Sequence, residues 1–530
     1  MTTRQCLPMT LLVVAAFVVH CGVARSKSAN LLEHDEAISL LVAAGKSQRV
    51  DTLYSRMSYL QLLRAADLQD LLHPTKDVRT RDVVRSLSQR DIHPPLYFLV
   101  LHGMGELGIH RQAVLRLLGT FIFFIAAWTA NRWIWPNASP LARCLGTAWL
   151  LLTPTMVDIA TELRQYAFVY LGVVVSIAAL VVWWQQITPS RHAVMLLALG
   201  PVILLYSQFG TIIWVAVGLI AAIGHLTARQ WRRWRLLACS VSGATILLLP
   251  LLLWAVQINL SRQDGPLQPI DNFYGGAFQP LCGSLAESWW LMPWRWRGSL
   301  FSPVMAALML AVSALLAWRR GQPVDQVLWL AAFVWGGFWL AALTFGRIPP
   351  HAVEPKQLAP AILIPICLLV RAGIPGQPGA GGRIAVGVLA VSVIGLSFGT
   401  ARSLISSHEP VLAGALREAD CLIADAPRRG YLLPLAEKMK PHARIVIAAP
   451  ETAIAQWPTL VGLLPDDRLL TAELGLPGGE GHQPDAAVFF DRLSRMYREV
   501  VPLWKGPRRT LTEFRHRGSE PPVGRESQDG

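Results

Sequence analysis

Eleven stretches of this sequence are long enough and apolar enough to cross a membrane as helices. About 20 predominantly apolar residues span the ~30 Å of hydrocarbon in a bilayer. Across the 530 residues, 53% are hydrophobic and only 15% are charged, and the mean hydropathy is positive. This composition excludes a soluble protein of this size and predicts a polytopic α-helical membrane protein. The eleven stretches are centred on residues 7–24, 112–131, 141–160, 165–184, 192–206, 208–227, 235–257, 299–318, 324–345, 357–372 and 383–400.

The formal net charge of +14 would indicate a nucleic-acid partner in a soluble chain. In a membrane protein, basic residues gather in cytoplasmic loops and contact lipid headgroups. We therefore expect membrane lipids as partners and no nucleic acid. The seven cysteines form no CxxC pair, so a metal or redox centre built from thiolates is not expected.

Two basic clusters orient the chain in the membrane, "ARQWRRWR" at 228–235 and "WRRG" at 318–321. Both must be cytoplasmic under the positive-inside rule. Counting the spans backward from the basic stretch at 228–235 places the start of the span at 112–131 outside. With a cytoplasmic N-terminus, the first span also ends outside, so the two results agree only if residues 94–109 do not cross the membrane. That segment is short and carries His102 and Glu106, and a charge in a lipid-exposed span costs a few kcal/mol. We expect an amphipathic helix on the outer surface.

This topology predicts a membrane domain over residues 1–400 that contains a long first external loop, 25–111. Residues 401–530 are more polar and are expected outside, as a small α/β domain with a disordered tail. The predicted strands are "CLIAD", "RIVIAA" and "RTLTEF", and the predicted helices are "GYLLPLAEKM", "AIAQWPTLVGLL" and "DAAVFFDRLSRMYREV". The expected location is the inner (plasma) membrane, with the C-terminal domain external.

The first external loop opens with "LLEHDEAISLLVAAG", which places Asp35 and Glu36 at or near a helix start. Two interpretations stay open. Asp35 caps the helix, a contribution of roughly 0.5 to 2 kcal/mol, or one of the carboxylates accepts a proton from an attacking hydroxyl. Further along, "DIHPPLY" sets His93 before two prolines that fix an extended entry into the surface helix. His93 is structural or belongs to a site on the same side of the membrane.

The stretch "TELRQYAF" brings Glu162, Arg164 and Tyr166 to the external mouth of a span. Ionisable residues at that depth predict a functional site, although Glu162 and Arg164 can also pair with each other.

The stretch "RIPPHAVEPK" adds Arg347, His351 and Lys356 on the same side. Three basic groups facing outward oppose the positive-inside pattern, and an anionic ligand such as a phosphate would explain them. Charge-assisted contacts to a phosphate contribute about 1.5 to 3 kcal/mol each.

The order of "HDEA", "HPPLYFLVLH" and "ELRQYA", followed by a basic stretch ahead of a late span, resembles the GT-C glycosyltransferases. The most similar branch is the bacterial one related to protein O-mannosyltransferases and lipid A aminoarabinose transferases. The resemblance implies a GT-C fold, with about 11 transmembrane helices here, that transfers a monosaccharide from a polyprenyl-phosphate donor at the external face. The acceptor would be a glycan, lipid or protein hydroxyl, and no residue pattern in the sequence chooses among these. A single displacement would invert the anomeric centre.

The resemblance also implies roles for individual residues. Asp35 would be the base or acceptor-orienting carboxylate, with Glu36 adjacent to it. Basic residues would surround the donor phosphate: His93, Arg164, Lys356, His351 and Arg347. Glu162 and Tyr166 would stand beside them.

The sequence departs from the family pattern at two motifs. Lys356 and Gln357 stand where the late motif usually carries an Arg-Tyr pair, which weakens the phosphate contact expected there. Glu162 and Arg164 stand without a DxD pair. No metal or other cofactor is expected, because the motif does not support a divalent ion.

Two alternatives share the spans and the external basic groups. The first is a transporter or flippase for a lipid-linked sugar, which a broken helix at mid-membrane would favour. The second is a polymerase or ligase of surface polysaccharide. The sequence favours the monosaccharide transferase, because a flippase rarely needs an acidic pair in a long external loop together with a folded external domain.

Overall fold

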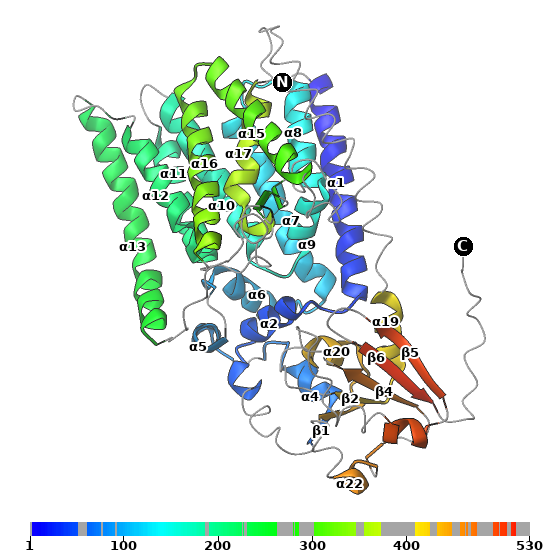
Figure 1. Cartoon of the computed structure of the whole chain (residues 1–530). Coiled ribbons are helices and arrows are strands. Elements are labelled where there is room, and N and C mark those ends of the chain that lie inside the picture. Colours follow the sequence, from blue (N-terminus) through cyan, green and yellow to red (C-terminus); the bar gives the residue numbers. More distant parts are fainter. Residues whose placement is uncertain are drawn as a thin grey trace. The chain divides into compact units, whose positions relative to one another are not determined.

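The structure is a computed structural model of the chain (Figure 1). It describes residues 3–50, 61–75, 78–90, 93–185, 190–224, 226, 230–261, 279, 281–282, 284–285, 301–345, 355–372, 409–424, 432–447, 456–461, 463–464, 468–473, 491–497, 499–505 and 510–515.

Contacts between residues divide the chain into two units. We call Met1–Arg25, Ile92–Val100 and Arg111–Ser406 the helical unit, and Ser26–Asp91, Leu101–His110 and Ser407–Gly530 the sheet unit.

The helical unit is a bundle of apolar helices (Figure 1). Its elements are α1 (Thr3–Ala29, ending in the sheet unit), α7 (Gln112–Thr129), η1 (Ala130–Ile134), α8 (Pro140–Leu152), α9 (Pro154–Thr161), α10 (Tyr166–Gln185), α11 (Arg191–Ser207), η2 (Phe209–Thr211), α12 (Ile212–Gly224), α13 (Trp231–Ser261), α15 (Phe301–Arg319), α16 (Pro323–Thr344), η6 (Pro355–Gln357) and α17 (Ala359–Ala372).

The chain is a polytopic helical membrane protein, as the sequence predicts. Five of the described helices are long and apolar enough to cross a bilayer, and the bent pair α8–α9 makes a sixth. Shorter apolar helices, α11, η2 with α12, α15 and α17, coincide with other predicted spans. The predicted span at 383–400 lies outside the described residues. The total of eleven spans stays a prediction.

The 50° bend between α8 and α9 follows from two adjacent residues. Pro154 has no N–H to continue the helix and restricts the residue before it to extended conformations. Thr153 is extended at φ −63° and ψ 140°, and its hydroxyl accepts a hydrogen bond from the Met156 N–H. One helix therefore ends and a second, capped helix begins in a new direction.

Helix α10 is the core of the helical unit, since 89% of its most apolar window is buried. Glycine allows α11 to approach it closely. A Cβ at Gly172 of α10 would lie 2.7 Å from Leu204 Cγ, and one at Gly200 of α11 would lie 2.6 Å from Ser176 Oγ. Such small residues let transmembrane backbones come together and gain dispersion contacts.

The segment at 94–109 forms helix α6 (Leu96–Glu106), of 11 residues. At 1.5 Å per residue it extends only about 16 Å, against ~30 Å for the hydrocarbon core. Its length supports the prediction that it does not cross the bilayer. Its location on the outer surface stays a prediction.

The sheet unit contains a six-stranded mixed sheet in the order β1-β3-β2-β4-β6-β5. Strands β3, β2 and β4 are parallel, and β1, β6 and β5 join by antiparallel pairing. The strands are β1 (Gln61–Arg64), β2 (Cys421–Ala424), β3 (Arg444–Ile447), β4 (Arg468–Glu473), β5 (Glu499–Lys505) and β6 (Thr510–Arg515). The helices are α2 (His34–Ala43), α4 (Ala65–Asp70), α5 (Thr80–Arg90), α19 (Glu409–Glu418), α20 (Leu432–Lys438) and α22 (Trp457–Val461).

The three predicted strands are confirmed as β2, β3 and β6, and two predicted helices correspond to α20 and α22. The prediction of one helix over 485–500 is wrong at its end, because Glu499 begins β5. The sequence reading also missed β1, a strand of the first loop that pairs with β3. The boundary at residue 400 between a membrane domain and a C-terminal domain stays a prediction.

Candidate functional site

Four of the predicted site residues meet at a buried ion pair in the helical unit. Lys356 Nζ lies 2.9 Å from Glu162 Oε1, and the two side chains are only 14% and 6% exposed. The ammonium is 5.0 Å from the centre of the Tyr166 ring, and the Arg164 guanidinium carbon is 5.7 Å from the same ring. Cations at these distances are attracted to the ring face. We call Glu162, Arg164, Tyr166 and Lys356 the Glu162 cluster.

Three short stretches of backbone build this cluster. Helix α9 ends at Thr161, and Glu162 is extended at φ −77° and ψ 139°. A turn follows before α10 begins at Tyr166, and η6 presents Lys356 just before α17. The end of α9 is held from α7, because Arg116 Nη1 donates a hydrogen bond of 2.9 Å to the Thr161 carbonyl.

The cluster holds ionised groups away from water. Burial raises the pKa of the Glu162 carboxyl, and the charge of Lys356 offsets part of that rise. Arg164 and Lys356 bring two positive charges to the Glu162 carboxyl, and the negative charge of Asp158 also acts on it. The N-terminus of α10 adds the positive end of a 20-residue helix. Two cations beside the positive end of a helix form a site suited to an anion.

The "HPPLY" segment lies beside the first turn of α10. The Tyr97 ring packs edge-on against Phe168, with ring centres 6.4 Å apart. Tyr97 is buried, and His93, one turn upstream, is half-buried. The structure thus brings this motif close to "ELRQYA". The contact of His93 with a phosphate stays a prediction.

The acidic pair lies in the sheet unit, on α2. The helix begins at His34 with Glu33 as its N-cap, so the interpretation of Asp35 as the cap is wrong. Glu36 is buried, and its Oε2 accepts a hydrogen bond of 3.2 Å from the Glu33 N–H. Asp35 is half-buried in the first turn. Glu36 therefore serves the helix start, and Asp35 is the better candidate for proton transfer.

Two predicted site residues, Arg347 and His351, lie outside the described residues. Within the part of the chain that the structure describes, no three histidine, cysteine, aspartate or glutamate side chains are grouped to hold a metal ion.

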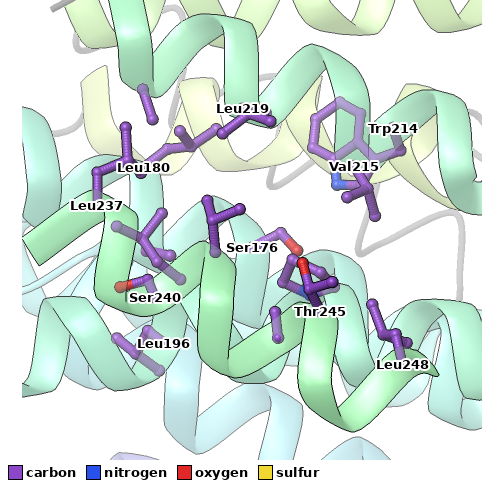
Figure 2. Close-up of a pocket in the computed structure, with 17 residues that line it drawn as sticks. Ser176, Leu180, Leu196, Trp214, Val215, Leu219, Leu237, Ser240, Thr245 and Leu248 are labelled. Atoms are coloured by element: carbon purple, nitrogen blue, oxygen red, sulfur yellow. The ribbon is translucent and has the colours of Figure 1, made fainter.

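An apolar cavity of about 210 Å³ opens between α10, α11, α12 and α13 (Figure 2). Its wall includes Leu180, Trp214 and Leu248. The hydroxyls of Ser176 and Ser240 also line it, and both donate to backbone carbonyls, to Gly172 and Leu236 respectively. The cavity therefore offers a hydrocarbon surface rather than polar partners.

No family model and no curated protein matches the sequence. Among solved structures, the chain is similar to ArnT from Cupriavidus metallidurans, both in the structure bound to undecaprenyl phosphate and in the apo state. Each match has 13% identity and a TM-score of 0.47, and covers 95% of this chain and 97% of the other.

Sequence reasoning missed two buried residues next to the cluster. Arg116 is 1% exposed in α7, and Gln165 is 0% exposed before α10. For Arg116 the signal was available, since an arginine within an apolar span predicts a functional or structural contact. Gln165 carried no such signal, because its burial depends on the packing of α10.

Proposed function

We propose that this protein is a membrane glycosyltransferase that transfers a monosaccharide from a polyprenyl-phosphate donor to an acceptor hydroxyl at the external face. The observation that carries the proposal is the Glu162 cluster: two cations, Arg164 and Lys356, buried at the N-terminus of the central helix α10. Cations buried at a helix N-terminus form a ready site for an anionic group such as a phosphate.

The charge of the cluster fits the chemistry of such a donor. A sugar linked to a polyprenyl phosphate is a phosphodiester with one negative charge, which Arg164 and Lys356 would attract. When the sugar leaves, negative charge grows on the phosphate. Positive groups already in place stabilise that charge without reorganisation, which is the largest catalytic contribution in many enzymes.

The transfer is a single displacement. The acceptor oxygen forms a bond to the anomeric carbon as the bond between that carbon and the phosphate oxygen breaks. The bonding electron pair leaves with the polyprenyl phosphate, and the hydroxyl proton passes to the Asp35 carboxylate. Attack opposite the leaving group inverts the anomeric centre. No nucleotide is needed, because the phosphate itself is the leaving group.

The cavity of Figure 2 supports a lipid-linked donor. Ser176, in its wall, follows Tyr166 by ten residues on α10, which is about 15 Å along the helix. An apolar cavity of about 150 Å³ binds benzene, so 210 Å³ takes on the order of one or two isoprene units. We propose that part of the polyprenyl chain lies there.

The two alternatives predict different products. A flippase would move the lipid-linked sugar across the bilayer without forming a new bond, and a polymerase or ligase would transfer oligosaccharides. We favour the transferase, because the external "HDEA" helix supplies a half-buried carboxylate that a flippase does not require.

The test is transfer of label by the full-length protein in vesicles supplied with radiolabelled polyprenyl-phosphate monosaccharides. We expect a covalent labelled product, and Asp35→Asn should lower kcat by roughly 10²- to 10⁴-fold with a smaller effect on KM, because a general base contributes about that much. Asp491→Asn, at an exposed surface position, is the matched control. Equal turnover by a folded Asp35→Asn protein would exclude Asp35 as the base, and relocated but chemically unchanged donor would identify a flippase.

A further inference from the structure

Gln165 is a completely buried polar residue whose side chain makes no hydrogen bond to the described protein. Its exposed fraction is 0%, and both Oε1 and Nε2 are buried without a partner among the described residues. Its backbone carbonyl accepts from Phe168 N–H at 3.0 Å and from Val169 N–H at 3.4 Å. Gln165 therefore occupies the N-cap of α10, where a polar side chain usually bonds to the first turn of the helix.

Such a residue lowers stability. Leaving a buried donor or acceptor unpaired costs about 1–3 kcal/mol for each group. More than nine in ten buried polar groups in native proteins have a partner, so an exception calls for an explanation. An apolar side chain of similar volume would avoid this cost. The glutamine at this position is explained if a bound molecule pairs with its amide.

The place of Gln165 in the chain indicates which molecule that is. It stands directly between Arg164 and Tyr166, two members of the Glu162 cluster, and three residues after Glu162. It also caps the helix whose N-terminus favours an anion. A ligand held by the cluster through its phosphate would present the groups attached to that phosphate close by.

The chemistry of the amide distinguishes the phosphate from the sugar. A carboxamide both donates, through Nε2, and accepts, through Oε1. An ionised phosphodiester only accepts, so it would leave Oε1 unpaired. A sugar hydroxyl donates and accepts, and two neighbouring hydroxyls on one ring satisfy both ends of the amide.

We propose that Gln165 binds neighbouring hydroxyl groups of the donor sugar and sets the specificity for that sugar. This inference rests on the proposed function. A site built to hydrogen-bond a hydroxyl rejects the analogue that lacks it strongly, because the buried protein group is then left unpaired.

The experiment compares donors with and without one ring hydroxyl in wild type and in Gln165→Met, in the full-length protein. For wild type, we expect the deoxy donor to have a kcat/KM roughly 10- to 100-fold lower than the parent donor. In Gln165→Met the ratio of kcat/KM for the parent donor to kcat/KM for the deoxy donor should fall to near one, because the amide that discriminates between the donors is gone. Gln165→Asn keeps the amide chemistry and should restore part of the discrimination.

A thermal unfolding measurement separates this role from a structural one. Without ligand, Gln165→Met should melt at the same temperature as wild type or higher, since it removes unpaired buried groups. Gln185→Met, at the exposed C-terminal end of α10, is the matched control and should change neither readout. The variant Gln165→Leu repeats the test with a second apolar side chain.

The outcomes are distinct. If wild type transfers sugar and Gln165→Met keeps the full discrimination against the deoxy donor, the assignment of Gln165 is wrong while the proposed function stands. A lower melting temperature with unchanged discrimination would make Gln165 a structural residue and also overturns the inference. If wild type transfers label from none of a panel of polyprenyl-phosphate pentoses and hexoses, the proposed function fails and this inference fails with it.

Discussion

The Glu162–Lys356 pair links the stability of the fold to pH at the level of single residues. Burial raises the pKa of Glu162, so the folded protein binds the proton of this carboxyl more tightly than the unfolded chain does. The contribution of Glu162 to stability is therefore fully present below the unfolded pKa, about 4.3, and is lost as the pH rises through the higher folded pKa.

The variant Glu162→Gln tests this linkage, because it does not titrate. We expect the melting temperature of wild type, minus that of Glu162→Gln, to fall as the pH is raised from about 4 and to level off above the folded pKa. The measurement is thermal unfolding in detergent over that range, with Glu418→Gln as an exposed control. A difference that grows with pH would contradict the burial of the carboxyl as the dominant effect.

The same residues show what the sequence could predict at this scale. The sequence predicts external polar groups at the ends of apolar spans, namely Glu162, Arg164, Tyr166 and Lys356. Their pairing was out of reach, because Lys356 and Glu162 are 194 positions apart and only the packing of α9, α10 and α17 brings them together. The sequence therefore predicted Lys356 as a phosphate ligand without its counter-ion.

Helices α16, α17 and η1 are joined by charged groups that lie inside the helical unit. Asp325, which is 0% exposed at the start of α16, pairs with Arg371 of α17 at 2.7 Å and with Arg320 at 2.9 Å. Arg371 also donates a hydrogen bond of 2.9 Å to the Ile134 carbonyl at the end of η1. Asp325 and Arg371 together thus join the ends of three elements.

Removing this carboxylate should destabilise the bundle. Asp325→Leu leaves Arg371 buried without its counter-charge, and breaking a buried pair from one side costs about 3–5 kcal/mol. The double variant Asp325→Leu with Arg371→Met should recover much of that loss, because an apolar pair often replaces a buried ion pair without penalty. Thermal unfolding in detergent measures both, with Arg319→Gln as an exposed control. A double variant no more stable than the single one would contradict this account.

At the level of elements, local periodicity predicted apolar helices well and the sheet less well. Apolar runs such as that of α10 fix a helix by composition alone, because a bilayer requires internal hydrogen bonding. The sequence pattern predicts helix for the first two residues of β5, because the identity of this strand depends on pairing with β6. Strand β1 was missed for the same reason: its partner β3 lies nearly 400 residues away in the chain.

The whole molecule has two faces that the charge pattern distinguishes. The basic stretches 228–235 and 318–321 predict the cytoplasmic side, and the Glu162 cluster lies at helix ends that this orientation places outside. The cluster must lie at the external face of the membrane if the donor phosphate is presented there. Only five or six described helices are long enough to span the membrane by themselves. The predicted orientation is therefore inferred from the basic residues in the loops and not from a count of spans.

Single cysteines report this orientation in intact cells through an impermeant thiol reagent. Gly103→Cys, in α6, should be labelled from outside, because the 11-residue helix is too short to cross and is predicted to lie in the external loop. Ala228→Cys, in the basic stretch, should be labelled only after the membrane is permeabilised. The parent protein sets the background from its seven native cysteines. Labelling of Ala228→Cys in intact cells would invert the topology and would place the proposed phosphate site on the cytoplasmic side.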